Sequence, residues 1–195
     1  MRTGLLGGTF NPPHLGHLHA ARLAQQALGL DRVLFIPTNI PPHKALPEDT
    51  ATAADRCEMV RRMTADQPWA RLDTIEIDRG GASYTVDTLR ALHARGEEDL
   101  YLIVGTDMLL SFDRIWRAPE EIARLSTLAV CAREEEDWPT LARKAETLRR
   151  ELAGRRTAPL YRARGRGLYR AASFVRILTI QHFDINRKAG QSYVV

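Results

Sequence analysis

Short apolar segments that alternate with amphipathic segments constrain the fold of this chain more than any other feature of its sequence. Thr3–Gly7 and Arg32–Pro37 are apolar runs typical of buried strands, and His17–Leu28 between them has apolar residues at helical spacing. A strand, a helix and a second strand within about 35 residues form a βαβ unit. The sequence therefore predicts two parallel strands joined by a right-handed crossover.

The same alternation continues along the chain and sets the fold class. We expect further strands at Leu72–Ile77, Leu100–Val104, Leu128–Cys131 and Phe174–Ile180, and helices at Thr52–Ala65, Thr85–Ala94, Met108–Phe112, Pro119–Leu125 and Pro139–Leu152. Repeated strand-then-helix order with apolar strands is typical of a parallel sheet covered on both faces. The predicted fold is thus α/β, a Rossmann-like doubly wound parallel sheet.

The length of the chain fits one domain. Its 195 residues lie in the usual size range, so we assign residues 1–195 to a single domain with an atypical C-terminal segment from about residue 155. In that segment Gly165–Gly167 is typical of a loop, and Asn186–Val195 has no clear helix signal. Thr85 is the expected N-cap of its helix, two residues before Asp87.

Composition excludes several classes of protein. With 44% hydrophobic and 27% charged residues, the chain resembles an ordinary globular domain. No apolar run approaches the roughly 18–20 residues that span a bilayer, and no secretory signal precedes the first strand. We therefore expect a cytoplasmic protein with no membrane partner. Cys57 and Cys131 match no zinc or redox spacing, which favours two buried, reduced thiols.

The segment Arg143–Arg170 is rich in arginine, and its acidic residues are Glu146 and Glu151. Such a segment can bind nucleic acid or a phosphate-rich ligand. No interleaved aromatic platform for stacking bases accompanies it. An exposed helix and loop explain the arginines more simply, so nucleic acid is not the expected partner. RNA binding with a steep salt dependence stays open as a third hypothesis.

The residues after the first strand have the chemistry of a phosphate site. Gly7 and Gly8 let the backbone turn and approach a ligand closely, and the next helix offers free N–H groups at its start. His14 and His17 are three residues apart, so both imidazoles face one side of the first helical turn, with the Thr9 hydroxyl nearby. The glycines fit neither a dinucleotide-redox fingerprint nor a P-loop. Without a third ligand nearby, we predict no metal site here.

The segment GGTFNPPHLGH, residues 7–17, closely resembles the (T/H)xGH-containing opening of the class I nucleotidyltransferase superfamily. Within that superfamily, further segments resemble the motifs of the bacterial nicotinate-mononucleotide adenylyltransferases. These are PPHK at 41–44, GGASYTVDTL at 80–89, VGTDML at 104–109, and Trp116. The matches cover roughly residues 1–135, and their combination is highly specific.

The resemblance implies an activity that explains which residues the chain lacks. Members of the family transfer the adenylyl group of ATP to nicotinate mononucleotide, and Mg²⁺ accompanies the triphosphate, held mostly by phosphates and water. The attacking group is a phosphate that is already largely ionised, because its second pKa is about 6. Such a reaction needs positioning and charge stabilisation rather than a serine or cysteine nucleophile.

The resemblance also assigns the phosphate contacts. His14, His17 and Lys44 would be the catalytic residues, with His17 stabilising the transition state. The ATP phosphates would be surrounded by the Thr9 hydroxyl and by the backbone around Gly8 and Phe10. Gly7 would also belong to the ATP site.

Further contacts follow from the later motifs. Gly105 and Asp107 would contact the adenosine ribose. Trp116 would stack on the pyridine ring of the mononucleotide. Backbone N–H groups near Thr85 would receive its carboxylate, and Lys44 would reach its phosphate.

The C-terminus departs from the family pattern. The family carries an SSTxIR segment, whereas this chain has FDINRKAGQSYVV, with Asn186 and Arg187 in place of the paired serines. A divergent functional end, a shortened product and weakened ATP binding are the three interpretations. The alternatives are accordingly a sibling adenylyltransferase with another acceptor, or a nucleotide-binding protein with weakened catalysis. The sequence leaves a homo-oligomer open.

Overall fold

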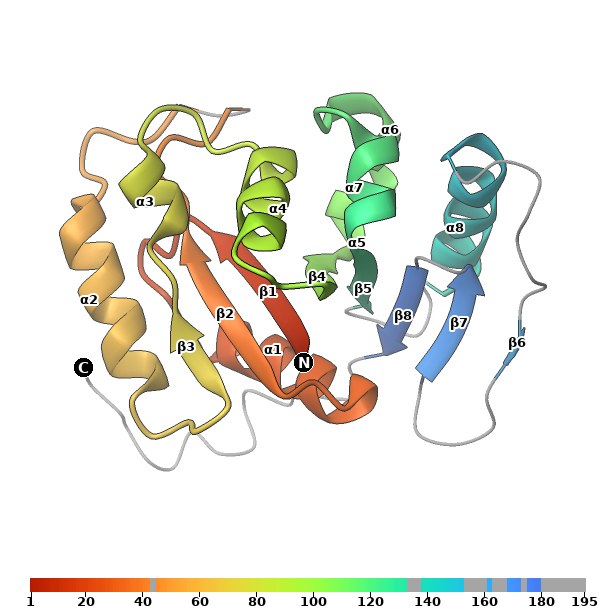
Figure 1. Ribbon diagram of the computed structural model, residues 1–195, viewed down its shortest axis with the longest axis horizontal. Helices are drawn as coiled ribbons and strands as arrows, with labels where there is room; N and C mark the ends of the chain where they lie inside the picture. The colour runs from red at the N-terminus through yellow and green to blue at the C-terminus, as the bar shows by residue number, and fades with distance from the viewer. Residues whose placement is uncertain (43–44, 133–137, 153–160, 163–167, 173–174, 180–195) are drawn as a thin grey trace.

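One sheet contains all the strands that the structure describes. The computed structural model describes residues 1–42, 45–132, 138–152, 161–162, 168–172 and 175–179. The strands are β1 (Arg2–Gly8), β2 (Arg32–Pro37), β3 (Ala70–Leu72), β4 (Asp99–Gly105), β5 (Thr127–Ala132), β6 (Tyr161–Arg162), β7 (Leu168–Ala172) and β8 (Val175–Thr179). Their spatial order is β3-β2-β1-β4-β5-β8-β7-β6 (Figure 1).

Six neighbouring strands of this sheet are parallel, as the sequence predicts. They run from β3 to β8, with Leu5 opposite Leu34 of β2 on one side and Leu102 of β4 on the other. The last two strands differ from the prediction, because β7 pairs antiparallel with β8 and β6 antiparallel with β7. The short separation between Ala172 and Val175 leaves no room for a parallel crossover, so these strands form a hairpin-like edge.

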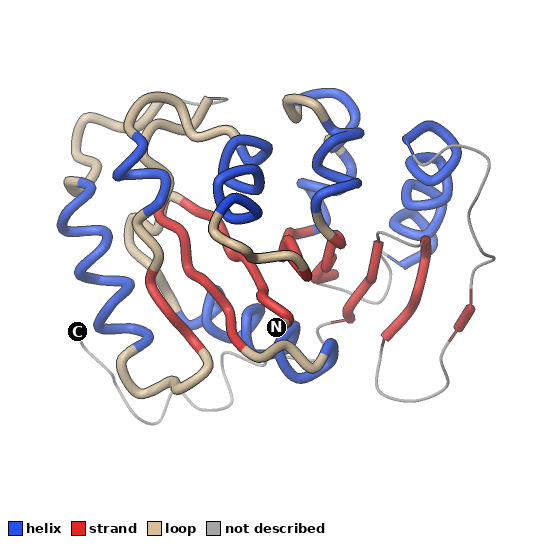
Figure 2. Tube along the Cα trace, viewed as in Figure 1, coloured by secondary structure: helices blue, strands red, loops and turns tan. Residues whose placement is uncertain are grey.

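Helices cover both faces of the sheet (Figure 2). They are α1 (Leu15–Leu28), α2 (Ala53–Thr64), α3 (Ile75–Arg79), α4 (Thr85–Ala94), α5 (Thr106–Leu110), α6 (Phe112–Ile115), α7 (Pro119–Leu125) and α8 (Trp138–Leu152). One core cluster holds the apolar faces of α1 and α2, and the other holds those of α3, α4, α7 and α8. The arrangement is therefore the predicted doubly wound α/β fold.

Side chains of the central strands alternate between the two cores. In β2, Leu34 and Ile36 join the cluster under α4, whereas Val33 and Phe35 join the cluster under α1. A strand buried on both faces needs apolar residues at every position, because neither face meets water. This requirement explains the unbroken apolar runs that identified the strands.

Four predicted element boundaries are wrong. In place of one helix at Met108–Phe112 the chain forms α5 and α6, which Ser111 separates. The strand expected at Leu72–Ile77 ends at Leu72, and Ile75 begins the short helix α3 because the Asp73 carboxylate accepts a hydrogen bond from its backbone N–H at 3.0 Å. The first helix begins at Leu15 rather than His17, with His14 as N-cap. Thr85 is the first residue of α4, so the N-cap is Tyr84.

Other sequence predictions have mixed outcomes. Cys57 and Cys131 are buried free thiols, as expected. In the described part of the chain, no helix combines the length and apolar character needed to cross a membrane. The predicted loop at Gly165–Gly167 and the tail from Asn186 to Val195 lie outside the described residues.

Candidate active site

The strand order reverses direction between β1 and β4, which creates a crevice at their carboxyl ends. The helix that follows β1, α1, packs in the cluster on one face, whereas Leu109 of α5, which follows β4, packs in the cluster on the other. Ligands of open α/β sheets bind at such a point, because the two connections leave in opposite directions. Gly8 ends β1 and Gly105 ends β4.

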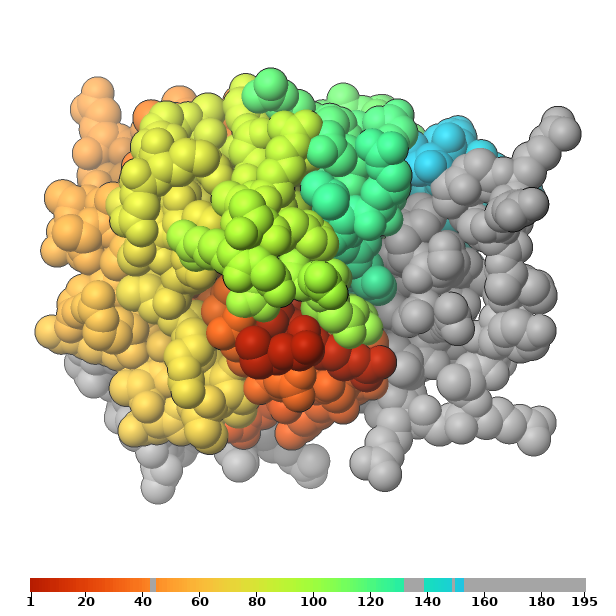
Figure 3. Space-filling model, viewed as in Figure 1, coloured from red at the N-terminus to blue at the C-terminus, as the bar shows by residue number. Residues whose placement is uncertain are grey.

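A cavity of about 470 Å³ lies at this crevice. Its size falls in the range of small-molecule sites. The lining comes from the ends of β1 and β4, the loop after β2, and the α4 and α6–α7 segments. These residues are Leu6–Thr9, Thr38, Pro41, Pro42, Glu76, Ser83–Thr85, Leu102–Gly105, Met108, Ile115–Arg117 and Ile122. Figure 3 shows α4 and α7 lying side by side on one face, in agreement with their packing contacts.

Gly7 and Gly8 shape the floor of the cavity, although they do not form the tight turn that the sequence predicts. Both belong to β1, so the chain turns only after them. A methyl group added at Gly7 would meet no protein atom within 4 Å, and the same holds for Gly105 on β4. Since both residues line the cavity, their missing side chains keep the crevice open where a ligand would approach the backbone.

Phe10 anchors the loop that follows β1. Its φ of 51° is one of two positive values among the described non-glycine residues. The ring is 2% exposed and packs against Phe35 of the sheet, with 6.1 Å between ring centroids, and against His17, at 5.0 Å. Phe10 therefore joins the phosphate loop to the core, and its side chain is structural rather than exposed to a ligand.

His14 and His17 face each other on the first turn of α1, as their spacing predicts. The ring centroids are 3.7 Å apart. The backbone N–H of His14 donates to Nδ1 of His17 at 3.1 Å, which leaves Nδ1 of a neutral His17 without a proton. The proton of that neutral ring then lies on Nε2, and Nε2 can donate to an anion.

His17 is held in its neutral form in the free protein. Partial burial, followed by the repulsion of a charged His14, lowers the pKa of His17 to about 4. His17 is thus a hydrogen-bond donor rather than a fixed cation near neutral pH, and a bound phosphate would raise its pKa by supplying the opposite charge.

Arg56 supports the same loop from behind. Its side chain is buried at 2% exposure and donates to the backbone carbonyls of Thr9 at 2.7 Å, Thr38 at 2.8 Å and Ala51 at 3.2 Å. These carbonyls belong to the loops after β1 and β2 and to the entry of α2. No described carboxylate forms an ion pair with Arg56. One guanidinium therefore fixes two walls of the crevice.

The loops after β2 and before α4 form the opposite wall and are tied together. The backbone N–H of Asn39 donates to the Ser83 hydroxyl at 2.9 Å, and the Ser83 N–H donates to the Ile40 carbonyl at 2.8 Å. Gly80 and Gly81 have φ values of 70° and 66°, which let the chain turn back toward Asn39. Glycine is therefore needed at both positions of the GGASYT segment because of the backbone conformation there, rather than to make room for a ligand.

Glu76 is a buried carboxyl group in this wall. It is 7% exposed and accepts a hydrogen bond from the Thr88 hydroxyl at 2.7 Å. Arg79 donates to the same hydroxyl oxygen at 3.2 Å. Burial raises the pKa of Glu76, because water no longer solvates its charge.

Trp116 and Arg117 close the cavity on the side of α6 and α7. The Trp116 ring packs against Phe112, with 5.3 Å between centroids, and its indole N–H is buried without a hydrogen-bond partner among the described residues. The Arg117 guanidinium lies over the Tyr84 ring at 4.7 Å from the ring centroid. The cavity thus combines an apolar aromatic end with a glycine-lined end.

Comparison with known sequences identifies the family. The sequence model described as cytidylyltransferase-like matches residues 5–180, which is most of the chain. The chain belongs to the cytidylyltransferase-like family. Its curated relatives place it with the nicotinate-nucleotide adenylyltransferases of that family. The probable enzyme of Marinobacter nauticus is 41% identical over 152 residues, which are 77% of this chain and 69% of the relative.

Two further curated relatives have the same name and a similar level of identity. The probable nicotinate-nucleotide adenylyltransferase of Citrifermentans bemidjiense is 45% identical over 157 residues, covering 79% of this chain and 69% of the relative. That of Trichlorobacter lovleyi is 48% identical over 136 residues, covering 69% of this chain. The match spans 63% of the Trichlorobacter protein, slightly less than two thirds of its length.

Solved structures with the same fold include members of this family. A putative nicotinate-nucleotide adenylyltransferase from Vibrio parahaemolyticus has a TM-score of 0.53 and 20% identity, covering 75% of this chain and 82% of its own. The Plasmodium falciparum nicotinic acid mononucleotide adenylyltransferase complexed with NaAD has a TM-score of 0.58 and 13% identity, covering 73% and 70%. At these identities the likeness supports the Rossmann-like fold alone.

Only some of the site residues predicted from the sequence line the cavity. Its lining includes Gly7, Gly8, Thr9, Thr85, Gly105 and Trp116. His14, His17 and Asp107 are outside the lining, and Asp107 is exposed on the first turn of α5. Lys44 lies outside the described residues.

Sequence reasoning missed three residues that shape the cavity. They are Arg56, Glu76 and Arg117. None belongs to one of the motifs identified above, and a lone charged residue is usually exposed to solvent. Arg117 could have been found from its position directly after Trp116. Arg56 and Glu76 gave no local signal, because their burial depends on contacts far along the chain.

Proposed function

We propose that the protein transfers the adenylyl group of ATP to nicotinate mononucleotide, giving nicotinate adenine dinucleotide and pyrophosphate, in the cytoplasm. The observation that carries this proposal is the cavity at the β1–β4 crevice, whose lining combines Gly7, Gly8 and Thr9 with Trp116. The family membership and the names of the relatives support the same reaction.

At the loop end, His17 donates from Nε2 to oxygens of the ATP phosphates. His14 and the Thr9 hydroxyl add further donors, and the backbone around Gly8 approaches the same phosphates. His14 and His17 are outside the lining of the cavity, so the triphosphate extends from Gly8 and Thr9 toward the start of α1. The N-terminal end of this helix favours the negative charge.

The rest of the cavity receives the two nucleosides. Gly105 and Asp107 at the end of β4 contact the adenosine ribose, whose vicinal hydroxyls suit a carboxylate acceptor. Trp116 offers a flat apolar face to the pyridine ring. Backbone N–H groups near Thr85, on the first turn of α4, donate hydrogen bonds to the mononucleotide.

The chemical step requires no nucleophile from the protein. An oxygen of the mononucleotide phosphate attacks the α-phosphorus of ATP, the new P–O bond forms, and the bond from that phosphorus to the bridging oxygen breaks as pyrophosphate leaves. Negative charge moves onto the leaving pyrophosphate. His17 stabilises this charge, and the loop fixed by Phe10 and Arg56 keeps the donors in place.

A divalent cation fits this site as part of the ATP substrate. Among the described lining residues the one carboxylate is Glu76, and its oxygen is engaged by the Thr88 hydroxyl. Such a donor set suits Mg²⁺ held by phosphate oxygens and water, rather than by a protein cage. Bound there, Mg²⁺ would neutralise phosphate charge.

A direct assay tests the proposal. The purified protein is incubated with ATP, Mg²⁺ and nicotinate mononucleotide, and both pyrophosphate and dinucleotide are measured. We expect equal amounts of the two products. Parallel reactions with the amide mononucleotide and with phosphopantetheine identify the acceptor. A lack of product with nicotinate mononucleotide at high enzyme concentration would remove the catalytic proposal and leave the fold unaffected.

A further inference from the structure

Arg117 is the one basic side chain among the described residues that line the cavity. It follows Trp116 directly, so it lies at the aromatic end rather than at the phosphate loop. In the described part of the wall, an anionic group of the substrate therefore has Arg117 as its one basic partner.

Arg117 is held in place by contacts that leave its charge available. The guanidinium lies over the ring of Tyr84, 4.7 Å from the ring centroid, and Nη1 is 3.8 Å from Oδ2 of Asp87. The side chain of Arg117 is 59% exposed, so these contacts orient it without burying it. A stacked, loosely paired arginine keeps donors free for another carboxylate.

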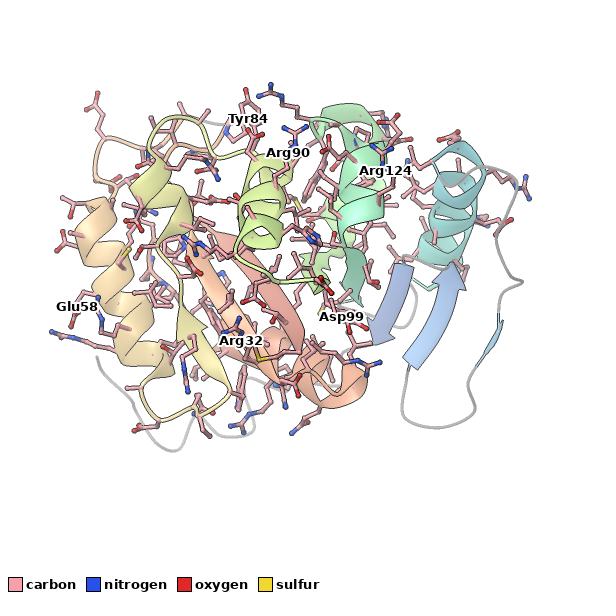
Figure 4. All side chains as sticks on the ribbon, viewed as in Figure 1. Arg32, Glu58, Tyr84, Arg90, Asp99 and Arg124 are labelled. Carbon is pink, nitrogen blue, oxygen red and sulfur yellow. The ribbon has the colours of Figure 1, made fainter. Side chains whose placement is uncertain are left out.

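Asp87 does not neutralise Arg117 completely, because its carboxylate also forms an ion pair with Arg90. Nη1 of Arg90 donates to the other carboxylate oxygen of Asp87 at 2.9 Å. The rest of the Arg90 guanidinium pairs with Glu121 of α7, at 2.8 and 2.5 Å. Of the two arginines, Arg90 therefore has the closer acidic partners. Figure 4 shows Tyr84 and Arg90 near each other beside α4.

The backbone next to Arg117 is strained. Ala118 has a φ of 52°, in the left-handed region that an alanine rarely adopts. Pro119 begins α7 directly afterwards. Such a turn fixes where the chain leaves the cavity wall, and strain of this kind concentrates at ligand sites. The turn therefore holds Arg117 at the mouth of the cavity.

We propose that Arg117 is a specificity-determining residue, which joins the backbone N–H groups near Thr85 in binding the carboxylate on the pyridine ring and thereby selects the acid mononucleotide over its amide. This inference rests on the proposed function. The phosphate of the mononucleotide must reach the α-phosphorus of ATP at the loop end. The ring, stacked on Trp116, then presents its carboxylate to the adjacent guanidinium. A carboxylate accepts two parallel N–H bonds from arginine, whereas a carboxamide has one acceptor oxygen and no charge.

The test compares two acceptors in matched variants. We expect Arg117→Gln to lower kcat/KM for nicotinate mononucleotide roughly 10- to 100-fold and to leave kcat/KM for the amide mononucleotide within about twofold. Arg117→Lys should restore part of the preference, since it keeps the charge but not the planar fork. Arg22→Gln is the control, because Arg22 also lies over an aromatic ring, that of Trp69 at 5.8 Å, but is outside the cavity lining, so its loss should leave the ratio between acceptors unchanged.

Two results would overturn the assignment. Equal losses of kcat/KM for both acceptors would mean that Arg117 binds the mononucleotide phosphate or supports the wall, and an unchanged kcat/KM for both would mean that it contacts neither acceptor. If the wild-type protein turned over neither acceptor, the proposed function would fail separately. Calorimetry of the two mononucleotides with wild-type protein and Arg117→Gln would then decide the question, with selective loss of acid binding supporting the role and no selective loss refuting it.

Discussion

His14 and His17 stack at the start of α1, with 3.7 Å between their ring centroids and 31° between their planes. Two imidazolium ions at this distance would repel each other, and His17 is also partly buried. The backbone N–H of His14 meanwhile occupies Nδ1 of His17. Together these contacts select one charge state and one tautomer of His17 before any ligand binds.

The pKa of His17 can be measured directly. We expect an NMR titration of the ligand-free protein to place it at about 4, well below the ordinary value of 6.5. In His14→Ala the pKa should rise and still remain below 6.5, because desolvation is the larger cause. Pyrophosphate should raise it in the wild-type protein. A ligand-free midpoint near 6.5 would contradict this account.

The same shift predicts a pH dependence of stability. Since the folded-state pKa lies below the unfolded one, His17 contributes its full stabilisation above about pH 6.5 and loses it as the pH falls toward about 4. We expect about 1 kcal/mol, because solvent screens a half-exposed group. Comparing wild type with His17→Gln by thermal unfolding at pH 7.5 and 5 isolates this contribution. A difference between the two proteins that does not change with pH would refute it.

Arg56 should act on both the fold and the phosphate loop. Replacing it with glutamine leaves the carbonyls of Thr9 and Thr38 without their donor, so we expect a loss of about 2–4 kcal/mol in unfolding free energy. Well below the melting temperature, the KM for ATP should rise about tenfold or more, because the loop loses its position. Arg56→Lys should recover part of both. Unfolding and steady-state kinetics give the two readouts.

Arg32→Gln provides the matched control for Arg56. Arg32 pairs with Glu97 and donates to the Thr3 hydroxyl, at the end of the sheet opposite to Tyr84 (Figure 4). Its loss should lower stability without changing the KM for ATP. If both variants raised that KM equally, the effect would come from general destabilisation rather than from the loop.

The sequence predicted the parts of the fold that depend on local periodicity. Strands β1, β2, β4 and β5 were recognisable because both of their faces are buried, and the pairing of His14 with His17 followed from helical spacing alone. The segment at Ile75–Arg79 misled the prediction, since Ile75 and Ile77 alternate with acidic residues as in a strand. The hydrogen bond from the Ile75 N–H to the Asp73 carboxylate, just before the Thr74 N-cap, accompanies the start of the helix.

Features that depend on distant contacts could not be predicted. The antiparallel edge of β7 and β8 depends on which strand the C-terminal part finds in space, and its residues carry no signal of direction. Arg56 is buried because carbonyls from three loops converge on it. The exposure of Asp107 follows from where α5 begins, which motif matching does not fix.

Gly7 should be a site where a small substitution impairs binding and spares the fold. A Cβ at Gly7 has no protein atom within 4 Å, so Gly7→Ala should unfold within about 1 kcal/mol of the wild type. The added methyl group would project where the cavity floor meets a ligand, and we expect a severalfold higher KM for ATP.

Gly4→Ala, on the same strand, makes the opposite prediction. Its Cβ would lie 2.8 Å from the Leu30 Cδ1 atom and 3.1 Å from Val33 Cγ2, so overpacking should cost about 1–3 kcal/mol. The KM for ATP of the folded fraction should not change. Melting curves and ATP titrations of both variants separate the two effects, and a strongly destabilised Gly7→Ala would show that the floor is packed rather than open.

Glu76 should make the cavity wall sensitive to pH in the opposite sense to His17. Burial raises the folded-state pKa, so the stabilisation from this carboxyl group is full below its ordinary pKa of 4.5 and is lost as the pH rises through the folded value. Glu76→Gln keeps an acceptor for the Thr88 hydroxyl and carries no charge. Its melting temperature relative to the wild type should therefore rise between pH 5 and pH 8, by about 2–4 °C for each kcal/mol of relief.

Glu76→Ala distinguishes the charge from the hydrogen bond. Without an acceptor, the buried Thr88 hydroxyl loses its 2.7 Å bond, so this variant should be about 1–3 kcal/mol less stable than Glu76→Gln at both pH values. Differential scanning calorimetry of the three proteins at pH 5 and pH 8 provides the measurement. A glutamine variant whose difference from the wild type stays constant over that range would mean that Glu76 remains ionised throughout, with Arg79 and the hydroxyl groups of Thr88 and Ser83 compensating for its burial.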